Sequence, residues 1–310
     1  MLASDLLIFL SRMEAEARIE TTLERAVATA TVNTCPARLA EAVRYAVFPG
    51  GGRIRPGLCL AVADACGAPG SRLAEAAAAA VELLHCASLI QDDLPCFDDA
   101  SLRRGRPALH QRFSQEIAIL VGDVLIVSAF DLVAAEVADL PIPAANILRA
   151  LARGAGAPVG LAAGQAWESE PAIDVAAYHR AKTAALFEAA AVAGAEAAEV
   201  NPEAWRKVGG LLGEAYQLAD DLADALGESA QLGKPIEQDR HNQRPNMVTR
   251  LGAGEASQRL DDLLARAKQY LPACSQRRKI EEFLDRAAGR LRPSGWRAKV
   301  ENLARVAGVL

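Results

Sequence analysis

Apolar residues recur at helical spacing along most of the 310-residue chain, and glycine or proline separates one apolar stretch from the next. Alanine and leucine dominate these stretches, β-branched residues are sparse, and no segment convincingly alternates apolar and polar positions as a half-buried strand does. The pattern therefore predicts roughly ten helices. We expect them near residues 5–29, 36–48, 56–66, 72–93, 112–137, 144–153, 159–169, 175–200 and 201–226, with further helical stretches in the tail.

Two polar segments, 94–107 and 227–245, interrupt this pattern, and each follows a helix that ends in clustered aspartates. Most other connections are short, and long loops in a compact domain often carry function. The chain shows no internal repeat and no low-complexity linker. The sequence therefore predicts one all-α domain over residues 1–310, in which these two polar loops are candidates for a functional site.

Composition narrows the class of protein. Charged residues make up 24% of the chain and hydrophobic residues 51%, which is typical of a globular protein with a sizeable core. The net charge of −5 argues against a nucleic-acid binder that works through a broad positive field. An acidic protein can still bind an anion where its basic residues converge or where it recruits metal ions.

Signals for export or membrane insertion are weak. The apolar run Leu6–Leu10 is short and lacks a basic flank, and Glu82 and His85 interrupt the longer stretch Ala76–Ile90. The six cysteines form no C-x-x-C pair and lie in apolar stretches, as buried reduced thiols do. We expect a cytoplasmic protein with no signal peptide and no membrane span.

The first aspartate cluster places Asp92, Asp93, Asp98 and Asp99 within eight residues at the end of an apolar helix. Carboxylates oppose the negative end of a helix dipole and repel one another, so this placement is costly unless cations neutralise it. A turn at Pro95 can bring Asp98 back toward Asp92, which gives the hard oxygen ligands that Mg²⁺ prefers. A solvated acidic loop is the alternative, and this cluster alone does not exclude it.

The second aspartate cluster consists of Gln217, Asp220, Asp221 and Asp224, which lie at i, i+3, i+4 and i+7 and share one helix face. The opposite face carries leucines typical of a core. An acidic stripe on a helix is usually its solvated face. A second D-D-x-x-D unit that again precedes a basic loop, here with Lys234, is hard to explain by chance, so the pair favours a metal site.

Basic residues accompany both clusters. Arg103 and Arg104 follow the first cluster, and Arg53 and Arg55 follow the glycines at 50–52. Glycines allow the backbone to approach an anion closely, although such a turn is more often a plain helix connection.

Two further candidates lie inside apolar helices. His85 precedes Asp92 by two helical turns, and Lys182-Thr183 interrupts an alanine-rich helix. A lone histidine is more often a satisfied core residue. A buried lysine needs an anionic partner, whereas a lysine that extends its ammonium to water does not.

Taken together, these motifs resemble those of the trans-isoprenyl diphosphate synthases, the polyprenyl synthetase family, over about residues 40–250. The set is most similar to the bacterial geranylgeranyl diphosphate synthases, as is the stretch Gly164–Glu170. The resemblance implies about ten antiparallel core helices around a deep central cavity, the isoprenoid synthase fold, as a homodimer. It also implies a Mg²⁺-dependent prenyltransferase that condenses isopentenyl diphosphate head to tail (1′-4) with dimethylallyl, geranyl or farnesyl diphosphate, giving geranylgeranyl diphosphate (C20).

The same resemblance implies residue roles. The ligands and neighbours of about three Mg²⁺ ions would be Asp92, Asp93, Asp98, Asp220, Asp221 and Asp224. The residues that bind the allylic diphosphate would be Arg103, Lys182 and Lys234. Those that bind isopentenyl diphosphate would be Arg53, Arg55, His85 and Arg104. Thr183 and Gln217 would lie near the developing cation and the leaving diphosphate.

Two regions bear on substrate contacts and on product length within the family that the chain resembles. Gly52 stands where members usually carry lysine in G-G-K-R-x-R-P, so a contact to isopentenyl diphosphate is missing or another residue supplies it. Ala87 and Ser88, about one turn before Asp92, are small, whereas farnesyl diphosphate synthases tend to place an aromatic residue there. We therefore expect a C20 product, with a farnesyl diphosphate (C15) synthase as the alternative.

Two other classes of protein remain as alternatives. A class I terpene cyclase usually replaces the second aspartate motif and lines its cavity with aromatic residues, which make up only 5% here. A non-catalytic subunit of a heteromeric prenyl synthase typically loses one or both aspartate motifs, and both are intact here. Activity of the purified single chain with Mg²⁺ and both substrates separates an enzyme from such a subunit.

Overall fold

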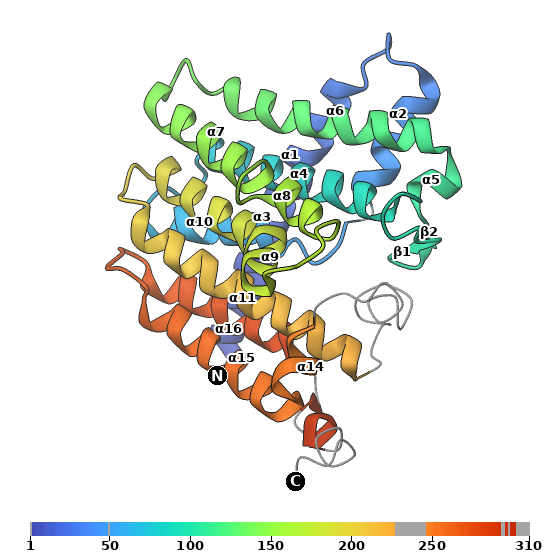
Figure 1. Cartoon of the computed structure of the whole chain (residues 1–310). Helices are drawn as coiled ribbons and strands as arrows, with labels where there is room; N and C mark the ends of the chain where they lie inside the picture. Colours follow the sequence, from blue (N-terminus) through green and yellow to red (C-terminus); the bar gives the residue numbers. More distant parts are fainter. Residues whose placement is uncertain (1, 49, 227–245, 293–294, 297, 302–310) are drawn as a thin grey trace.

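The structure is a computed structural model. It describes residues 2–48, 50–226, 246–292, 295–296 and 298–301, with side chains from Met13 onward. These residues are mostly helical, which confirms the predicted all-α class. The elements in chain order (Figure 1) are α1 (Leu2–Ala30), α2 (Ala37–Val47), α3 (Ile54–Ala65), α4 (Arg72–Asp93), β1 (Leu102–Arg103), β2 (Arg106–Pro107), α5 (Leu109–Arg112), α6 (Gln115–Ala134), α7 (Pro141–Ala155), α8 (Leu161–Trp167), α9 (Val175–His179), the π-helix η1 (Arg180–Ala184), α10 (Ala185–Ala197), α11 (Glu203–Ala225), α14 (Met247–Leu251), α15 (Ala253–Gln269) and α16 (Arg277–Leu291).

Helix α10 lies at the centre of the packing and contacts α3, α4, α7 and α11. Nearly all of its side chains are buried, and most are alanine. Glycines bring the helices closer still, because a Cβ on Gly194 would lie 2.9 Å from Val62 Cβ of α3. On α11, a Cβ on Gly213 would lie 3.2 Å from Phe187 Cβ of α10. Small residues thus let α4 and α11, which carry the aspartate clusters, pack on the same central helix.

Helix α4 begins and ends where the sequence predicts. The Ser71 side chain caps its start by accepting a hydrogen bond from the Ala74 amide at 3.2 Å. It ends at Asp93 because Leu94, which precedes Pro95, adopts an extended conformation (φ −62°, ψ 151°). The helix therefore delivers Asp92 and Asp93 in its last turn.

The first polar segment contains a hairpin that the sequence pattern did not reveal. Leu102 pairs with Pro107 and Arg103 with Arg106 in a two-stranded antiparallel sheet. Its turn consists of Arg104 (φ 53°) and Gly105 (φ 72°), and two positive φ angles are what a two-residue hairpin turn of this type requires. Strands of two residues are too short to produce an alternating pattern.

The segment predicted as one helix over 175–200 is interrupted by η1 between α9 and α10. Helix α3 begins at Ile54, so Pro56 falls in its first turn rather than at its start. The predicted polar loop 227–245, with Lys234, lies outside the described residues.

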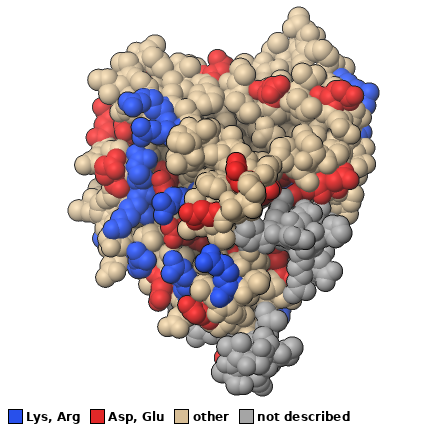
Figure 2. Space-filling model, in the orientation of Figure 1, with Lys and Arg blue, Asp and Glu red and all other residues tan. Residues whose placement is uncertain are grey.

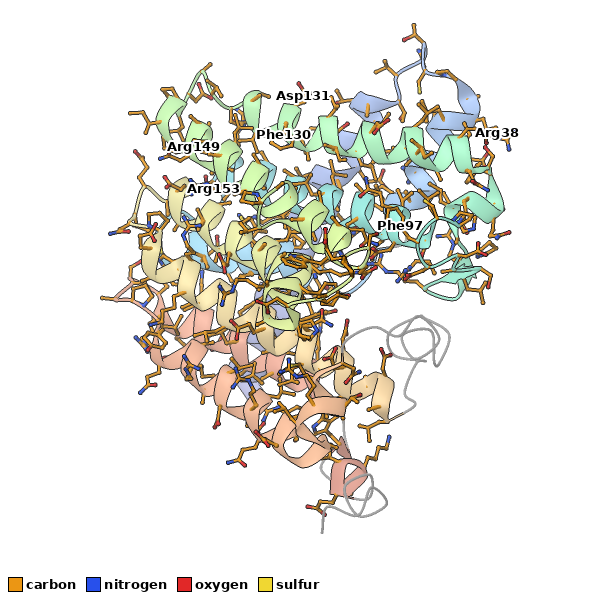
Figure 3. The ribbon with its side chains drawn as sticks, viewed as in Figure 1. Arg38, Phe97, Phe130, Asp131, Arg149 and Arg153 are labelled. Carbon is orange, nitrogen blue, oxygen red and sulfur yellow. The ribbon has the colours of Figure 1, made fainter. Side chains whose placement is uncertain are left out.

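Two described helices, α4 and α6, are long and apolar enough to cross a membrane, judged by length and composition alone. In α4, 78% of the 18-residue apolar stretch is buried, as expected of a core helix. In α6 the buried share is only 33%, and Ile119, Leu120 and Val127 are exposed. Helix α6 lies along the top edge of Figure 1, and Figure 3 labels Phe130 and Asp131 in it. An exposed apolar face of this kind is typical of a protein interface.

Surface charge is mixed on the face shown in Figure 2. Lys and Arg side chains gather on one side of it, with Asp and Glu among and around them. This distribution agrees with the net charge of −5 and offers no broad positive surface in this view.

Replacing Gly194 by alanine is expected to lower the free energy of unfolding by about 1–3 kcal/mol, because the new Cβ would overlap the Cys59 carbonyl oxygen of α3. The matched control is Gly254→Ala in α15, where a Cβ meets nothing within 4 Å. Alanine is the better helix former, so the control should keep or raise stability by up to about 1 kcal/mol. Urea unfolding followed by circular dichroism measures both, and equal stabilities would contradict this account of the packing.

Candidate active site

The first aspartate cluster folds back on itself at the end of α4. The Asp98 amide donates to the Asp92 carbonyl at 3.0 Å, and the Asp99 amide donates to the Leu94 carbonyl at 3.1 Å. The predicted return of Asp98 toward Asp92 is therefore confirmed at the backbone. Asp92, Asp93 and Asp98 are all less than one-tenth exposed, whereas Asp99 is exposed, so three of the four aspartates are not part of a solvated acidic loop. Figure 3 labels Phe97, the half-exposed residue that precedes Asp98 in this loop.

Arg103 and Asp93 form an ion pair that ties the hairpin to α4. Arg103 Nε lies 3.0 and 3.1 Å from the two Asp93 carboxylate oxygens, and Nη2 also donates to Asp93. Sequence analysis predicted Asp93 as a metal ligand or neighbour and Arg103 as a diphosphate contact. In the structure each is engaged by the other, so Asp93 orients Arg103 beside Asp92.

The π-helix η1 brings Lys182 and Thr183 to the space between the two aspartate clusters. Lys182 Nζ pairs with Glu168 and lies 3.6 Å from Asp92 Oδ1 of α4. The Thr183 hydroxyl donates to Gln217 Oε1 of α11. One widened turn thus contacts both acidic helices, and π-helical turns are common at functional sites.

Gly164 of α8 allows this arrangement, because a Cβ there would lie 2.8 Å from Lys182 Cβ. The close approach places Glu168, just after α8, beside Lys182 and beside the Tyr178 hydroxyl, which donates to Glu168 at 2.7 Å. In the sequence, Glu168 was noted only as part of the stretch Gly164–Glu170, without a role. A single acidic residue after a short helix carries no pattern that would have revealed its partners.

In the second aspartate cluster, Asp221 is buried and held by the chain itself. Its Oδ1 accepts from Gln217 Nε2 at 3.0 Å, and its Oδ2 accepts from the Met247 amide at 2.8 Å. Both oxygens are therefore engaged, which differs from a ligand facing a metal ion. Asp220 and Asp224, on the same helix face, are partly exposed.

Arg55 of α3, which is buried, pairs with His85 of α4, which is half-buried. Arg55 Nη1 lies 3.4 Å from His85 Nε2, and the guanidinium lies over Phe187 and Tyr216 at 4.6 and 5.3 Å from the ring centroids. Arg55 Nε is buried and has no hydrogen-bond partner among the described residues. An unsatisfied buried donor of this kind is where an anion is expected.

Electrostatics separate the roles of this pair. Burial, reinforced by the positive charge of Arg55 and then Arg104, lowers the pKa of His85 well below its ordinary value. His85 is therefore neutral at pH 7 and acts as a hydrogen-bonding group. Burial, followed by the Asp220 charge, raises the pKa of Tyr216, which stays a neutral phenol.

Arg53 has internal partners that the sequence did not indicate. It was expected to bind isopentenyl diphosphate, but its Nε donates to Glu20 at 2.7 Å and its Nη1 to Glu82 at 2.6 Å. Its Nη2 donates to the Val47 carbonyl at 3.1 Å. Arg53 is 8% exposed and ties α1 to α4. Sequence spacing placed it beside Arg55 but could not show that two distant glutamates engage it.

The remaining predicted residues are placed as follows. Arg104 lies against Gly51, whose Cβ, if present, would be 2.6 Å from Arg104 Nη2. Ala87 is buried in α4, whereas Ser88 is half-buried and its hydroxyl donates to the His85 carbonyl at 2.9 Å. Lys234 lies outside the described residues.

Comparison with known proteins gives a consistent result. The model of the polyprenyl synthetase family matches residues 36–279. The chain is 48% identical to a geranylgeranyl diphosphate synthase of Cereibacter sphaeroides, over 93% of this chain and 100% of that one. It is 44% identical to a geranylgeranyl diphosphate synthase of Rhodobacter capsulatus, over 88% of this chain and 94% of that one.

The fold is also similar to that of known prenyl-transferring enzymes. A Helicobacter pylori geranyltransferase, solved with magnesium and isoprenyl diphosphate, superposes with a TM-score of 0.72 at 26% identity, over 86% of this chain and 95% of that one. The matched family region contains both aspartate clusters, the glycine turn and η1. The chain therefore belongs to the polyprenyl synthetase family.

Proposed function

We propose that this protein condenses isopentenyl diphosphate head to tail with allylic diphosphates and releases geranylgeranyl diphosphate. The observation that carries the proposal is the bridge between the aspartate clusters, where Lys182 lies against Asp92 and Thr183 against Gln217. The names of two relatives at 48% and 44% identity support the C20 product class.

Mg²⁺ is the metal that the donor set fits. The clusters offer carboxylate oxygens, which a hard cation prefers. Within the part of the chain that the structure describes, no three His, Cys, Asp or Glu side chains converge on one point. Each ion would therefore complete its shell with water and diphosphate oxygens, as Mg²⁺ usually does.

Asp92 and Asp98 would hold Mg²⁺ on the α4 side, and Asp220 with Asp224 would hold it on the α11 side, for about three ions in all. When bound, Mg²⁺ neutralises the charge that develops on the leaving diphosphate. Asp221 joins α11 to α14 by accepting a hydrogen bond from the Met247 amide. Asp93 holds Arg103 in place through their ion pair.

The allylic diphosphate binds between the clusters. Lys182 and Arg103 are cations fixed at the edge of the first cluster by Glu168 and Asp93. Preorganised charges stabilise a leaving anion without having to reorganise during the reaction. Thr183 and Gln217 lie nearby, and the hydrogen bond from the Thr183 hydroxyl to Gln217 Oε1 fixes both side chains and leaves the Thr183 oxygen lone pairs for the developing cation.

Isopentenyl diphosphate binds at the Arg55–His85 pair. The unsatisfied Arg55 Nε donates to its diphosphate, the neutral His85 adds a hydrogen bond, and Arg104 adds charge from the hairpin. Phe187 and Tyr216 cover Arg55 and keep water from the site, which protects a carbocation from capture. Holding both substrates in one buried site supplies the proximity that the condensation needs.

The active unit is a homodimer formed through α6, and the chain acts as one domain in the cytoplasm. The exposed Ile119, Leu120 and Val127 support the dimer, since a face of this kind is usually covered. All six cysteines are free thiols, which supports a reducing compartment.

Asp92→Ala and Asp220→Ala should each reduce condensation about a thousandfold, or roughly 4 kcal/mol of transition-state stabilisation, because each removes a carboxylate from a metal site. The assay measures product formed by the purified chain with Mg²⁺, isopentenyl diphosphate and geranyl diphosphate. Asp139→Ala, an exposed carboxylate in a turn, is the control and should behave like the parent. Activity within a few fold of the parent in either cluster variant would refute the metal assignment.

Ala87→Phe should shorten the product from C20 to C15, because a ring one turn before the first cluster fills the space of the growing chain. Ser88→Phe tests the neighbouring, more exposed position, and comparison of the two shows which side chain faces that space. The measurement is product chromatography from dimethylallyl and geranyl diphosphate, with thermal unfolding as the check on folding. Unchanged C20 output from active variants would remove these residues from product control, and a parent that stops at C15 would refute the C20 product.

Leu120→Glu combined with Val127→Glu should convert the dimer to a monomer, because two carboxylates would be buried in the α6 interface. Light scattering coupled to size-exclusion chromatography measures the mass. Val32→Glu, equally exposed but after α1, should leave the dimer intact. A monomeric parent at micromolar concentration would contradict the proposal.

A further inference from the structure

The Glu168 carboxylate, which holds Lys182 beside Asp92, is itself held at both of its oxygens. Its Oε1 accepts a hydrogen bond from the Tyr178 hydroxyl at 2.7 Å as well as one from Lys182. Its Oε2 accepts a hydrogen bond from Gln165 Nε2 at 3.2 Å. The direction in which Glu168 faces Lys182 therefore depends on two neutral donors, and one of them is a tyrosine hydroxyl.

Tyr178 belongs to a different helix from the carboxylate that it contacts. Glu168 ends α8, whereas Tyr178 lies in α9 and is 5% exposed. Asp174 caps the start of α9 by accepting hydrogen bonds from the Ala176 and Ala177 amides at 3.0 and 3.2 Å, which fixes the short helix. A buried tyrosine hydroxyl needs an acceptor, and Glu168 provides it. The hydrogen bond thus joins α8 to α9.

The Tyr178 side chain also lies close to Lys182 itself. Lys182 follows it by four residues, in the π-helical turn, and Lys182 Nζ lies 5.8 Å from the centroid of the Tyr178 ring. The tyrosine hydroxyl and the lysine ammonium meet at one oxygen, Glu168 Oε1. Any movement of this oxygen would therefore move the ammonium relative to Asp92 Oδ1, which lies 3.6 Å away.

Lysine needs such support more than arginine does. Its ammonium is a point charge on a flexible four-carbon stem, so its position is set by its partners. The side chains of Lys182, Glu168 and Asp92 are only 16%, 13% and 10% exposed, so protein groups rather than bulk water determine where the charge lies. A cation fixed in advance stabilises a leaving anion without reorganising during the reaction.

We infer that Tyr178 is a positioning residue for the condensation, and that its hydroxyl acts through Glu168 to fix Lys182 where the allylic diphosphate binds. This inference rests on the proposed function, which places Lys182 at that diphosphate. Tyr178 itself touches neither substrate. Its ring fills the space beside the π-helical turn, and its hydroxyl sets the position of the charge.

Tyr178→Phe keeps the ring and removes only the hydroxyl. It should lower kcat/KM for geranyl diphosphate about tenfold, as expected for loss of a hydrogen bond to a charged group. The KM for isopentenyl diphosphate should stay within about twofold, because Arg55 and His85 are not among the contacts of Glu168. Tyr270→Phe makes the same change at an exposed tyrosine whose ring contacts Lys207, and should behave like the parent. Thermal unfolding checks that both variants fold.

A double-mutant cycle with Glu168→Ala tests the route of the effect. Without the Glu168 carboxylate the hydroxyl has lost its acceptor, so Tyr178→Phe should change affinity by less than about twofold in that background. The cycle is measured by equilibrium binding of geranyl diphosphate with Mg²⁺, in the absence of isopentenyl diphosphate, so that it needs no turnover. In the parent background the same measurement should show clearly weaker binding by Tyr178→Phe.

Parent-like kinetics and binding in Tyr178→Phe would overturn the inference. A loss shared equally by both substrates would do the same, since a hydroxyl that only stabilises the fold would produce it. An effect of Tyr178→Phe that persists in the Glu168→Ala background would also overturn it. A parent that binds geranyl diphosphate more tightly than Tyr178→Phe but forms no prenyl product would refute the proposed function and leave the positioning role standing.

Discussion

Carboxylates of like charge have to be held close together at the ends of α4 and α11, and the rest of the site depends on how this is done. The chain places one ammonium, Lys182, between Glu168 and Asp92. A π-helical turn sets its position, and the same turn lets Thr183 contact Gln217 on the opposite helix. Because the bridge belongs to the helix that continues into α10, the central packing helix also fixes the separation of the two clusters.

The glycine turn organises the second half of the site in a comparable way. Without side chains at residues 50–52, guanidinium groups approach the backbone closely. Arg53 forms internal ion pairs with Glu20 and Glu82, and these ion pairs hold α1, α3 and α4 together around the turn. Arg55 is then left without a partner at Nε. Arg53, held by ion pairs, and Arg55, with an unsatisfied donor, thus stand two residues apart, and only their partners distinguish them.

Sequence patterns were sufficient for what depends on neighbours in the chain. The bounds of α4, the return of Asp98 and the shared face of the second cluster all follow from local spacing, capping and turn chemistry. The roles of Arg53, Glu168 and Asp221 did not follow, because each is decided by a partner 14 to 33 residues away. The π-turn and the hairpin are too short to leave a periodic signal, and the exposed face of α6 has the same composition as a buried helix.

Burial explains why the proposed isopentenyl diphosphate site uses arginine and a neutral histidine. A lysine desolvated to the same extent as Arg55 would lose its charge more readily, whereas a guanidinium stays protonated and stacks on Phe187 and Tyr216. The positive charge of Arg55, added to burial, keeps His85 neutral, so the histidine adds hydrogen bonding without further repulsion. The aromatic cover over Arg55 therefore also decides which kind of cation can keep its charge in the proposed diphosphate site.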